Sequence, residues 1–429
     1  MTDHLRDAVR GAVLLPGDPG FDAARRPWNR AVEQPVAAVV EAADAEDVAA
    51  LVRHAAAAGL GIATQPNGHG ATGRTGGTIL LRTGRLDALE IDPGARRARV
   101  GAGVASGRLQ AAAAEHGLTG LPGSSPIVSV AGVALGGGLS WFGRAHGWVA
   151  ESVAAFEVVD AAGRARRVSA EDDPDLFWAL RGGGGDYAVV TALELDLHPA
   201  PALYGGRVLW DGAQAPAVLD AFRQITATAP PQLSAWFAVA KFPGGEPVVV
   251  VDVAHLGAQD EARELLAPLP PGARVDTRRV MSVAEVGSIT ADPTDPSPGQ
   301  SRAELLTVLD DTAAKTLLAD PVAPMLAIQV RHLGGALAGP AHGPHGPLTE
   351  PFAVYMLSLP GDGVLQRQGE LAAALPVSGR KPLTFLAPHE TAADAFAPDA
   401  LARLRAIKRE RDPGNVFRSN FPVTETTSR

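Results

Sequence analysis

The chain reads TQPNGHGATG from residue 64 to residue 73, a glycine-rich turn with a histidine near its centre. Gly68, Gly70 and Gly73 have the G-x-G-x-x-G spacing of a dinucleotide-binding loop. In such a loop a helix begins at the glycines and points its amides at a pyrophosphate. Residues 75–81 instead continue as a glycine pair and a predicted strand. The turn is therefore not the fingerprint of a Rossmann fold.

A glycine-rich loop can bind phosphate without a helix, because successive backbone amides form an anion-binding nest. Such loops occur at residues 67–73, 132–138 and 182–185. The alternative is that these glycines only permit tight turns between short strands. His69 is either an exposed bystander or a residue whose ring nitrogen is used. The number of such loops, and the histidine within one of them, favour a large phosphate-bearing cofactor.

The sequence around these loops alternates short strands with capped helices. Asp44 has the residue type of an N-cap, and an apolar stripe follows it until Gly59 ends the helix. Further helices are predicted at 106–117, 174–181 and 399–411, and strands at 78–81, 98–100, 156–160 and 188–197.

Residues 204–386 have longer and more widely spaced strands. They are predicted at 204–210, 235–240, 247–254, 325–332 and 352–359, with helices at 215–228 and 260–267. This pattern predicts an antiparallel sheet backed by helices. The segments 290–299 and 334–351 are rich in residues that break regular structure, so we expect loops or lids there.

The composition excludes several classes of function. A chain of 429 residues with 46% hydrophobic residues predicts a globular protein of two joined domains. A net charge of −9 argues against nucleic-acid and membrane partners. The absence of cysteine excludes disulfides, thiolate nucleophiles and cysteine-ligated metals. We see neither a signal-peptide core nor an apolar run of membrane-spanning length, and expect a soluble cytoplasmic protein.

Other chemical motifs are weak. His342 and His345 are spaced three apart, but proline and glycine between them prevent the helix that would direct both at one metal ion. No metal site is predicted, and no G-x-S-x-G nucleophile elbow occurs. Trp141, Trp148 and Trp178 are assigned to packing, because no arginine stripe accompanies them.

A series of ordered motifs resembles the flavoprotein oxidases of the vanillyl-alcohol-oxidase or PCMH type, and among them the berberine-bridge-enzyme-like branch. The motifs are Asn67-Gly68-His69, SPIVSVAG at 125–132, Gly136-Gly137-Gly138, DLFWALRGG at 175–183, Val189-Val190-Thr191 and DPGNVFR at 412–418. The resemblance extends over nearly the whole chain.

The resemblance implies an α+β fold. Its parts are a PCMH-type FAD-binding domain of two α/β subdomains over 1–200, a substrate-binding domain over 201–395, and a C-terminal segment, 396–429, that returns to the first domain. It also implies FAD, attached covalently through His69. The implied cofactor-binding residues are Asn67, Gly68, His69, Gly70, Ala71, Gly123, Ser124, Ser125, Val128, Gly132, Gly137, Gly138, Gly147, Val190, Asn415 and Phe417.

Two departures from the family pattern concern the cofactor. Ser125 stands where many relatives have a cysteine that forms a second covalent link, so at most one link can form. Val128 stands at the position that controls oxygen access in the family, and its small side chain favours an oxidase over a dehydrogenase.

Two further departures concern the substrate. Gln329 and Arg331 share one face of a strand on which glutamates are common in the family. The Tyr-x-Asn base of many relatives is missing from residues 384–387, which puts a sugar-oxidase role in doubt. The predicted catalytic residues are Gln329, Arg331 and Tyr355, with His332 and His389 as alternative proton acceptors. Arg331 suits the binding of a carboxylate or enolate.

The resemblance implies an FAD-dependent oxidase that transfers hydride from a small organic substrate to flavin N5 and passes the electrons to oxygen. We expect an oxidation or oxidative ring closure in secondary metabolism, by a monomer or homodimer. The alternatives are a dehydrogenase with another acceptor, a redox-neutral cyclase or isomerase that keeps FAD as a scaffold, and a flavin-binding protein without catalysis.

Overall fold

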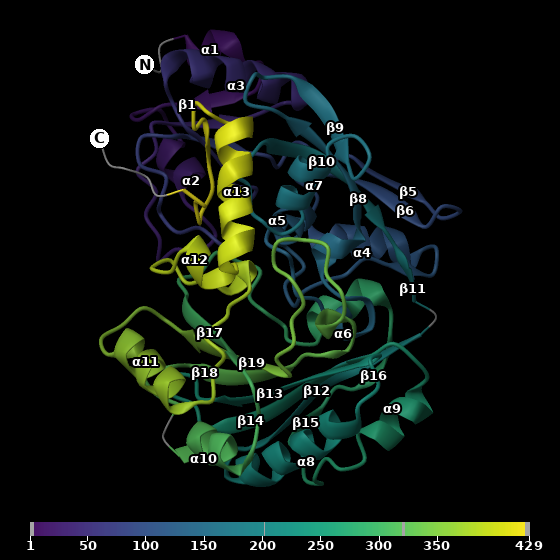
Figure 1. Ribbon diagram of the computed structural model, residues 1–429. Coiled ribbons are helices and arrows are strands. Elements are labelled where there is room, and N and C mark those ends of the chain that lie inside the picture. Colours follow the sequence, from purple (N-terminus) through teal and green to yellow (C-terminus); the bar gives the residue numbers. More distant parts are fainter. Residues whose placement is uncertain (1–3, 201, 320–321, 425–429) are drawn as a thin grey trace.

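The computed structural model describes residues 4–200, 202–319 and 322–424. The described residues form two five-stranded sheets and one eight-stranded sheet, called the large sheet below. In Figure 1 the five-stranded sheets lie in the upper part and the large sheet lies in the lower part. The predicted mixed α+β organisation is confirmed.

The first five-stranded sheet is largely parallel. Its order is β1-β2-β4-β3-β20, and only β1 runs against its neighbour. The strands are β1 (Ala12–Leu14), β2 (Ala38–Glu41), β3 (Ile62–Thr64), β4 (Ile79–Arg82) and β20 (Phe417–Arg418). Helix α3 (Ala45–Ala58) begins as predicted, because the Asp44 side chain accepts a hydrogen bond from the Asp47 amide at 3.0 Å. Since β20 pairs with β3, the chain returns to this sheet near its end.

The second sheet is antiparallel, with the order β5-β6-β10-β8-β9. Its strands are β5 (Leu89–Asp92), β6 (Arg97–Gly101), β8 (Val153–Val159), β9 (Ala165–Ser169) and β10 (Val189–Asp196). Helix α3 contacts β8, β9 and β10 of this sheet, and its buried residues share one core with β2, β3 and β4 of the first sheet, so it lies between the two sheets. The other helices of this part are α1 (Leu5–Ala8), α2 (Phe21–Arg25), α4 (Ser106–Ala114), α5 (Val130–Leu135), α6 (Gly143–His146), α7 (Pro174–Leu180), α12 (Ala392–Ala395) and α13 (Pro398–Arg411). A small sheet pairs β7 (Leu118–Thr119) with β11 (His198–Pro199).

The large sheet is antiparallel, with the order β15-β12-β14-β13-β18-β19-β17 and β16 beside β12. Its strands are β12 (Leu203–Asp211), β13 (Leu233–Ala240), β14 (Val248–His255), β15 (Val275–Asp276), β16 (Arg279–Met281), β17 (Gln300–Leu306), β18 (Ala327–His332) and β19 (Phe352–Ser358). The helices α8 (Ala215–Thr228), α9 (Gln259–Leu265), α10 (Asp311–Ala319) and α11 (Val364–Ala374) lie along its lower side in Figure 1. The predicted antiparallel sheet backed by helices is confirmed.

The structure also contains elements that the sequence pattern did not predict. Strand β17 and helices α10 and α11 fall in segments that were left without a prediction. Residues 132–138 are not a simple loop, because α5 covers their first half and Ser129 caps it by accepting from the Gly132 amide at 3.3 Å.

Candidate functional site

The first glycine-rich loop follows β3 and presents backbone amides that the protein itself leaves free. Among the described residues, the amides of Gly68 and Gly70 have no hydrogen-bond partner, whereas the His69 amide donates to Asn67 Oδ1 at 3.2 Å. Gly68 has a φ of 72°, and a Cβ there would lie 2.7 Å from the Cβ of Pro27. Glycine is therefore required at this position, and the turn it permits suits an anionic ligand.

The second loop, which precedes α5, is held next to the first. Asn67 Nδ2 donates to the carbonyl of Ile127 at 3.0 Å. Within the part of the chain that the structure describes, the amides of Gly123, Ser124 and Ser125 have no partner, and the Ser125 hydroxyl is buried without one. Buried polar groups are normally paired, so this arrangement fits a phosphate-bearing cofactor such as FAD.

The ring of His69 packs against an aromatic ring. Its ring centroid lies 4.2 Å from that of Trp28, and its side chain is exposed rather than packed into the core. Desolvation by the surrounding protein lowers the pKa of His69 from its ordinary 6.5, although Asp292 opposes the effect. At neutral pH the imidazole therefore carries a free nitrogen lone pair. Trp28 Nε1 donates to the carbonyl of Thr294 at 3.3 Å. Segment 290–299 is therefore bound to the tryptophan that contacts His69.

Four other predicted cofactor residues lie around these loops or in nearby elements. The amide of Ala71 donates to the carbonyl of Gly68 at 3.3 Å and closes the first loop. Val128 is half-buried at the end of the second loop. Val190 is buried in β10, and Gly147 ends α6 with a φ of 87°.

In the remaining glycine-rich segments most amides are bonded within the protein, whereas those of Gly138 and Gly185 have no partner among the described residues. Gly132 lies inside α5. The amides of Gly137, Gly182, Gly183 and Gly184 donate to backbone carbonyls at 3.1, 2.9, 3.0 and 2.9 Å. A Cβ at Gly138 would lie 2.6 Å from Val133. These glycines therefore permit close packing between chain segments.

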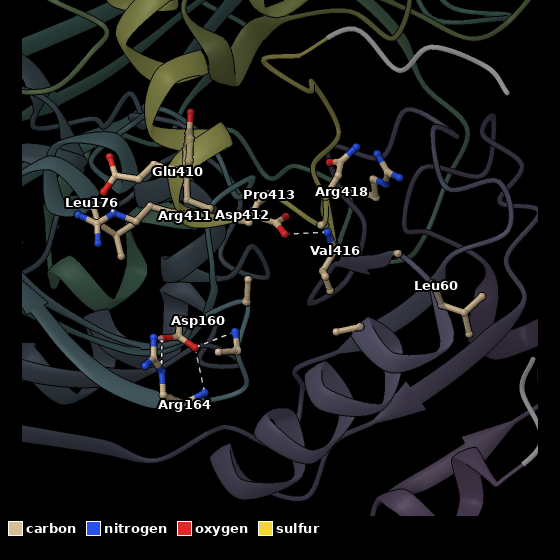
Figure 2. Close-up of a pocket in the computed structure, with 18 of the residues that line it drawn as sticks. Leu60, Asp160, Arg164, Leu176, Glu410, Arg411, Asp412, Pro413, Val416 and Arg418 are labelled. Carbon is tan, nitrogen blue, oxygen red and sulfur yellow. Dashed lines mark hydrogen bonds and ion pairs between the residues drawn. The ribbon is translucent and has the colours of Figure 1, made fainter.

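Asn415 and Phe417 lie apart from the two loops. Phe417 is buried in β20 and pairs with Ile62. Asn415 lines a cavity of about 400 Å³ between the end of α3, the turn after β8 and the segment after α13. Figure 2 shows this lining, with Asp160 bound to Arg164. The cavity adjoins the start of β3, whereas the His69 loop follows its end.

Gln329, Arg331 and Tyr355 share the face of the large sheet that is turned away from its helices. Gln329 pairs with Tyr355 in the register of β18 and β19, and Arg331 follows two residues along the same strand. The intervening Val330 points into the core beneath the helices. Trp236 pairs with Arg331 in the register of β13 and β18 and shares its face. The Trp236 ring stacks on Trp141 of the upper part, with ring centroids 3.6 Å apart. This face is therefore turned toward the part that carries the glycine-rich loops.

Arg331 lies in a cage of aromatic rings. Its guanidinium carbon is 4.0 Å from the ring centroid of Trp236, 5.1 Å from that of Tyr355 and 5.4 Å from that of Phe385. Its Nε donates to Gln329 Oε1 at 2.6 Å. Burial lowers the pKa of Arg331, but an arginine side chain stays protonated at physiological pH. The cage therefore holds a permanent positive charge.

A bidentate ion pair lies on the same face of the sheet. Arg207 Nε and Nη2 donate to the two carboxylate oxygens of buried Asp252 at 2.7 and 2.9 Å. Asp292, on segment 290–299, is half-buried and interacts electrostatically with both His69 and Arg331. This segment therefore adjoins both the histidine loop and the large sheet.

The alternative proton acceptors lie in different surroundings. His332 Nε2 lies 3.0 Å from Nη1 of Arg144, and burial, with Arg144 nearby, lowers the pKa of His332 to about 3. His389 is exposed on the segment that follows Phe385.

The two histidines of segment 334–351 fasten that segment to the upper part. Glu151 Oε2 lies 3.1 Å from His342 Nδ1, and Glu151 Oε1 lies 3.6 Å from His345 Nε2. Arg181 Nη2 also donates to Glu151 Oε2 at 2.7 Å. These contacts give the histidine pair a structural role that its spacing in the sequence did not reveal.

Several residues of the site escaped the sequence analysis. They are Trp28, Trp236, Asp292, Phe385 and Asn420, whose backbone carbonyl accepts from Thr72 Oγ1 at 3.0 Å. Only Phe385 had a signal, because it lies in the segment where the Tyr-x-Asn motif is missing. The others come from distant parts of the chain and are joined only by the fold.

The chain is similar to known proteins in sequence and in structure. A family model described as an FAD binding domain matches residues 36–169. The chain is 30% identical to (R)-6-hydroxynicotine oxidase of Paenarthrobacter nicotinovorans, over 97% of each chain.

Solved structures give the same picture. The crystal structure of 6-hydroxy-D-nicotine oxidase from Arthrobacter nicotinovorans superposes with a TM-score of 0.85 at 26% identity, covering 97% of this chain and 98% of that one. BBE-like 1 of Physcomitrella patens superposes with a TM-score of 0.86 at 20% identity, with the same coverage, and shares the fold. Within the described ranges, no helix has the length and apolar character needed to cross a bilayer.

Proposed function

The chain belongs to the berberine-bridge-enzyme-like FAD-linked oxidases, and on that premise we propose how its residues hold the cofactor and the substrate. It is an FAD-dependent oxidoreductase with a PCMH-type fold. The domain bounds that we propose are 1–200 together with 396–429 for FAD and 201–395 for the substrate.

The free amides of the first two loops are the proposed binding site for the FAD pyrophosphate. Gly68 and Gly70 supply amides from one side, and Ser124 and Ser125 supply them from the other. Amides that are already oriented toward an anion need little reorganisation when it binds. The buried Ser125 hydroxyl, which has no partner within the described residues, supports this assignment.

His69 is the proposed point of covalent attachment to the 8α-carbon of the flavin. Three observations support it: the side chain is exposed, its ring rests on Trp28, and its lowered pKa favours the neutral, nucleophilic imidazole. Ser125 allows no second link. A covalent bond would hold the cofactor in place and make it more oxidising.

FAD, when bound, supplies the hydride acceptor, and the protein orients the substrate toward it. Gln329 fixes Arg331 through the bond to Nε, and Arg331 binds the substrate by charge and hydrogen bonding. Tyr355 is our candidate for the residue that accepts the substrate proton. Its hydroxyl has no hydrogen bond within the described residues, and its ring borders the guanidinium.

The electron acceptor that we propose is molecular oxygen, because the side chain of Val128 is small. From the family we also propose a role in secondary metabolism, a cytoplasmic location and a monomeric or homodimeric state.

The test is anaerobic reduction followed by exposure to air. A panel of small organic metabolites should include one that bleaches the visible absorbance of the flavin, and air should restore the colour. A reduced enzyme that is reoxidised only by an artificial acceptor would be a dehydrogenase. Turnover without any bleaching would indicate redox-neutral use of FAD.

A further inference from the structure

The guanidinium of Arg331 has donors that the protein leaves unused. Nε is occupied by Gln329 Oε1, but Nη1 and Nη2 have no hydrogen bond or ion pair to any residue that the structure describes. The side chain is only half-buried, so these donors remain accessible. The carboxylate of Asp252 on the same face is already bound at both oxygens by Arg207. A ligand can therefore reach the two terminal nitrogens without displacing a protein group.

The charge of this cage is not compensated locally. Desolvation of a cation is costly unless a partner is supplied, and arginine does not escape the cost by losing its proton. Asp292 and Asp252 contribute longer-range attraction, but no ion pair joins either carboxylate to Arg331 in the described structure. An anionic ligand could therefore form a direct ion pair with Arg331, whereas a cationic ligand would be repelled.

The shape of the cage adds a second constraint. Trp236, Tyr355 and Phe385 present ring surfaces around the guanidinium, with Trp236 the closest at 4.0 Å. Flat apolar walls next to the charge favour a planar, conjugated ligand. Two parallel N–H groups match the two oxygens of a carboxylate better than a single oxyanion.

We propose that the substrate is a conjugated or aromatic carboxylic acid, bound as its anion with the carboxylate on Nη1 and Nη2 of Arg331. The inference rests on the proposed function, because it places the substrate on the sheet face that is turned toward FAD. It assigns Arg331 to substrate recognition, with Gln329 as the residue that positions it.

Binding of benzoate to the purified holoenzyme tests the proposal. Benzamide is the neutral isostere, and benzylamine is the cationic one. Isothermal calorimetry and the shift of the flavin absorbance spectrum measure each dissociation constant independently. We expect benzoate to bind more tightly than benzamide by about 10-fold or more, and benzylamine to bind most weakly.

Two variants identify the residue. R331M should weaken benzoate binding by about 10- to 100-fold and leave benzamide little changed. R331K keeps the positive charge but lacks the two parallel N–H donors of the guanidinium, so it should weaken benzoate binding roughly 10-fold. The control R279M removes an exposed arginine of β16, outside the cage, and should bind benzoate like the wild type.

Tighter binding of benzylamine than of benzoate would overturn the proposal, as would equal benzoate affinity in R331M and the wild type. The proposed function fails separately, if the purified protein contains no flavin or if the flavin is never reduced. Calorimetry does not depend on the flavin signal, so the two failures can be told apart.

Discussion

Lys381 offers a sharp test of how the wall of the substrate site is held in place. Its Nζ donates to Glu304 Oε1 at 2.9 Å and also to Glu390 Oε1, and all three side chains are buried. The contact joins the edge strand β17 to the segment that carries Phe385 into the Arg331 cage. The substitution Lys381→Met removes the cation between two carboxylates and keeps most of the apolar volume.

The expected loss of stability depends on which bonds Glu304 and Glu390 keep in the variant. Breaking a buried ion pair by removing one partner costs several kcal/mol, because the other charge stays buried. Here Arg302 Nε still donates to Glu304 at 2.6 Å, and the Ala387 amide still donates to Glu390 Oε2 at 2.8 Å. These remaining bonds place the loss at the lower end of the range, about 3 kcal/mol.

Urea denaturation of the holoenzyme, followed by tryptophan fluorescence, measures this loss. Lys315→Met is the matched control, since Lys315 is exposed on α10, and it should change the free energy of unfolding by less than about 0.5 kcal/mol. Adding Glu390→Gln to Lys381→Met should recover part of the loss, because one uncompensated charge disappears. Equal unfolding midpoints for K381M and K315M would refute the reasoning.

Three further predictions concern the cofactor loop and pH. Gly68→Ala should abolish FAD binding, because φ is 72° and the new Cβ would lie 2.7 Å from Pro27. Gly70→Ala is the control and should retain the flavin, because there is open space around Gly70. Similar flavin content in the two variants would contradict this account. His69→Ala should still bind FAD but release all of it in acid, as shown by the absorbance of the supernatant; a coloured pellet would exclude His69 as the link. The pKa of His332 is about 3 in the folded protein, against an ordinary 6.5. Between these pH values the unfolded chain binds a proton on His332 that the folded protein does not bind. The free energy of unfolding should therefore fall as the pH drops through that range. His332→Gln should reduce this slope by up to about 1.4 kcal/mol per pH unit, and an unchanged slope in urea titrations would contradict the burial argument.

The sequence predicted elements whose signals are local. Helix α3 was predicted because an N-cap aspartate, an apolar stripe and a terminal glycine all lie within it. Strand β17 was missed because Arg302 and Glu304 look like the residues of an exposed segment. In the fold Glu304 is buried, since Lys381 compensates its charge from 77 residues away in the chain.

The candidate site was predicted only in part, because some of its features depend on contacts between residues that are distant in the sequence. The glycine-rich loops were visible, but the sequence does not show which amides are already bonded within the protein. The amides of Gly182 and Gly183 are used internally, whereas those of Gly68 and Gly70 are free within the described chain. The support of His69 by Trp28 depends on long-range packing and had no sequence signal.

The covalent attachment of FAD through His69 is the claim most directly open to measurement. The measurement is mass spectrometry of the tryptic peptide 54–74 from acid-denatured holoenzyme. The account predicts that the peptide carries the mass of FAD less two hydrogens, with fragment ions that locate the added mass on His69 rather than His54. An unmodified peptide, with all of the flavin in the supernatant, would contradict it.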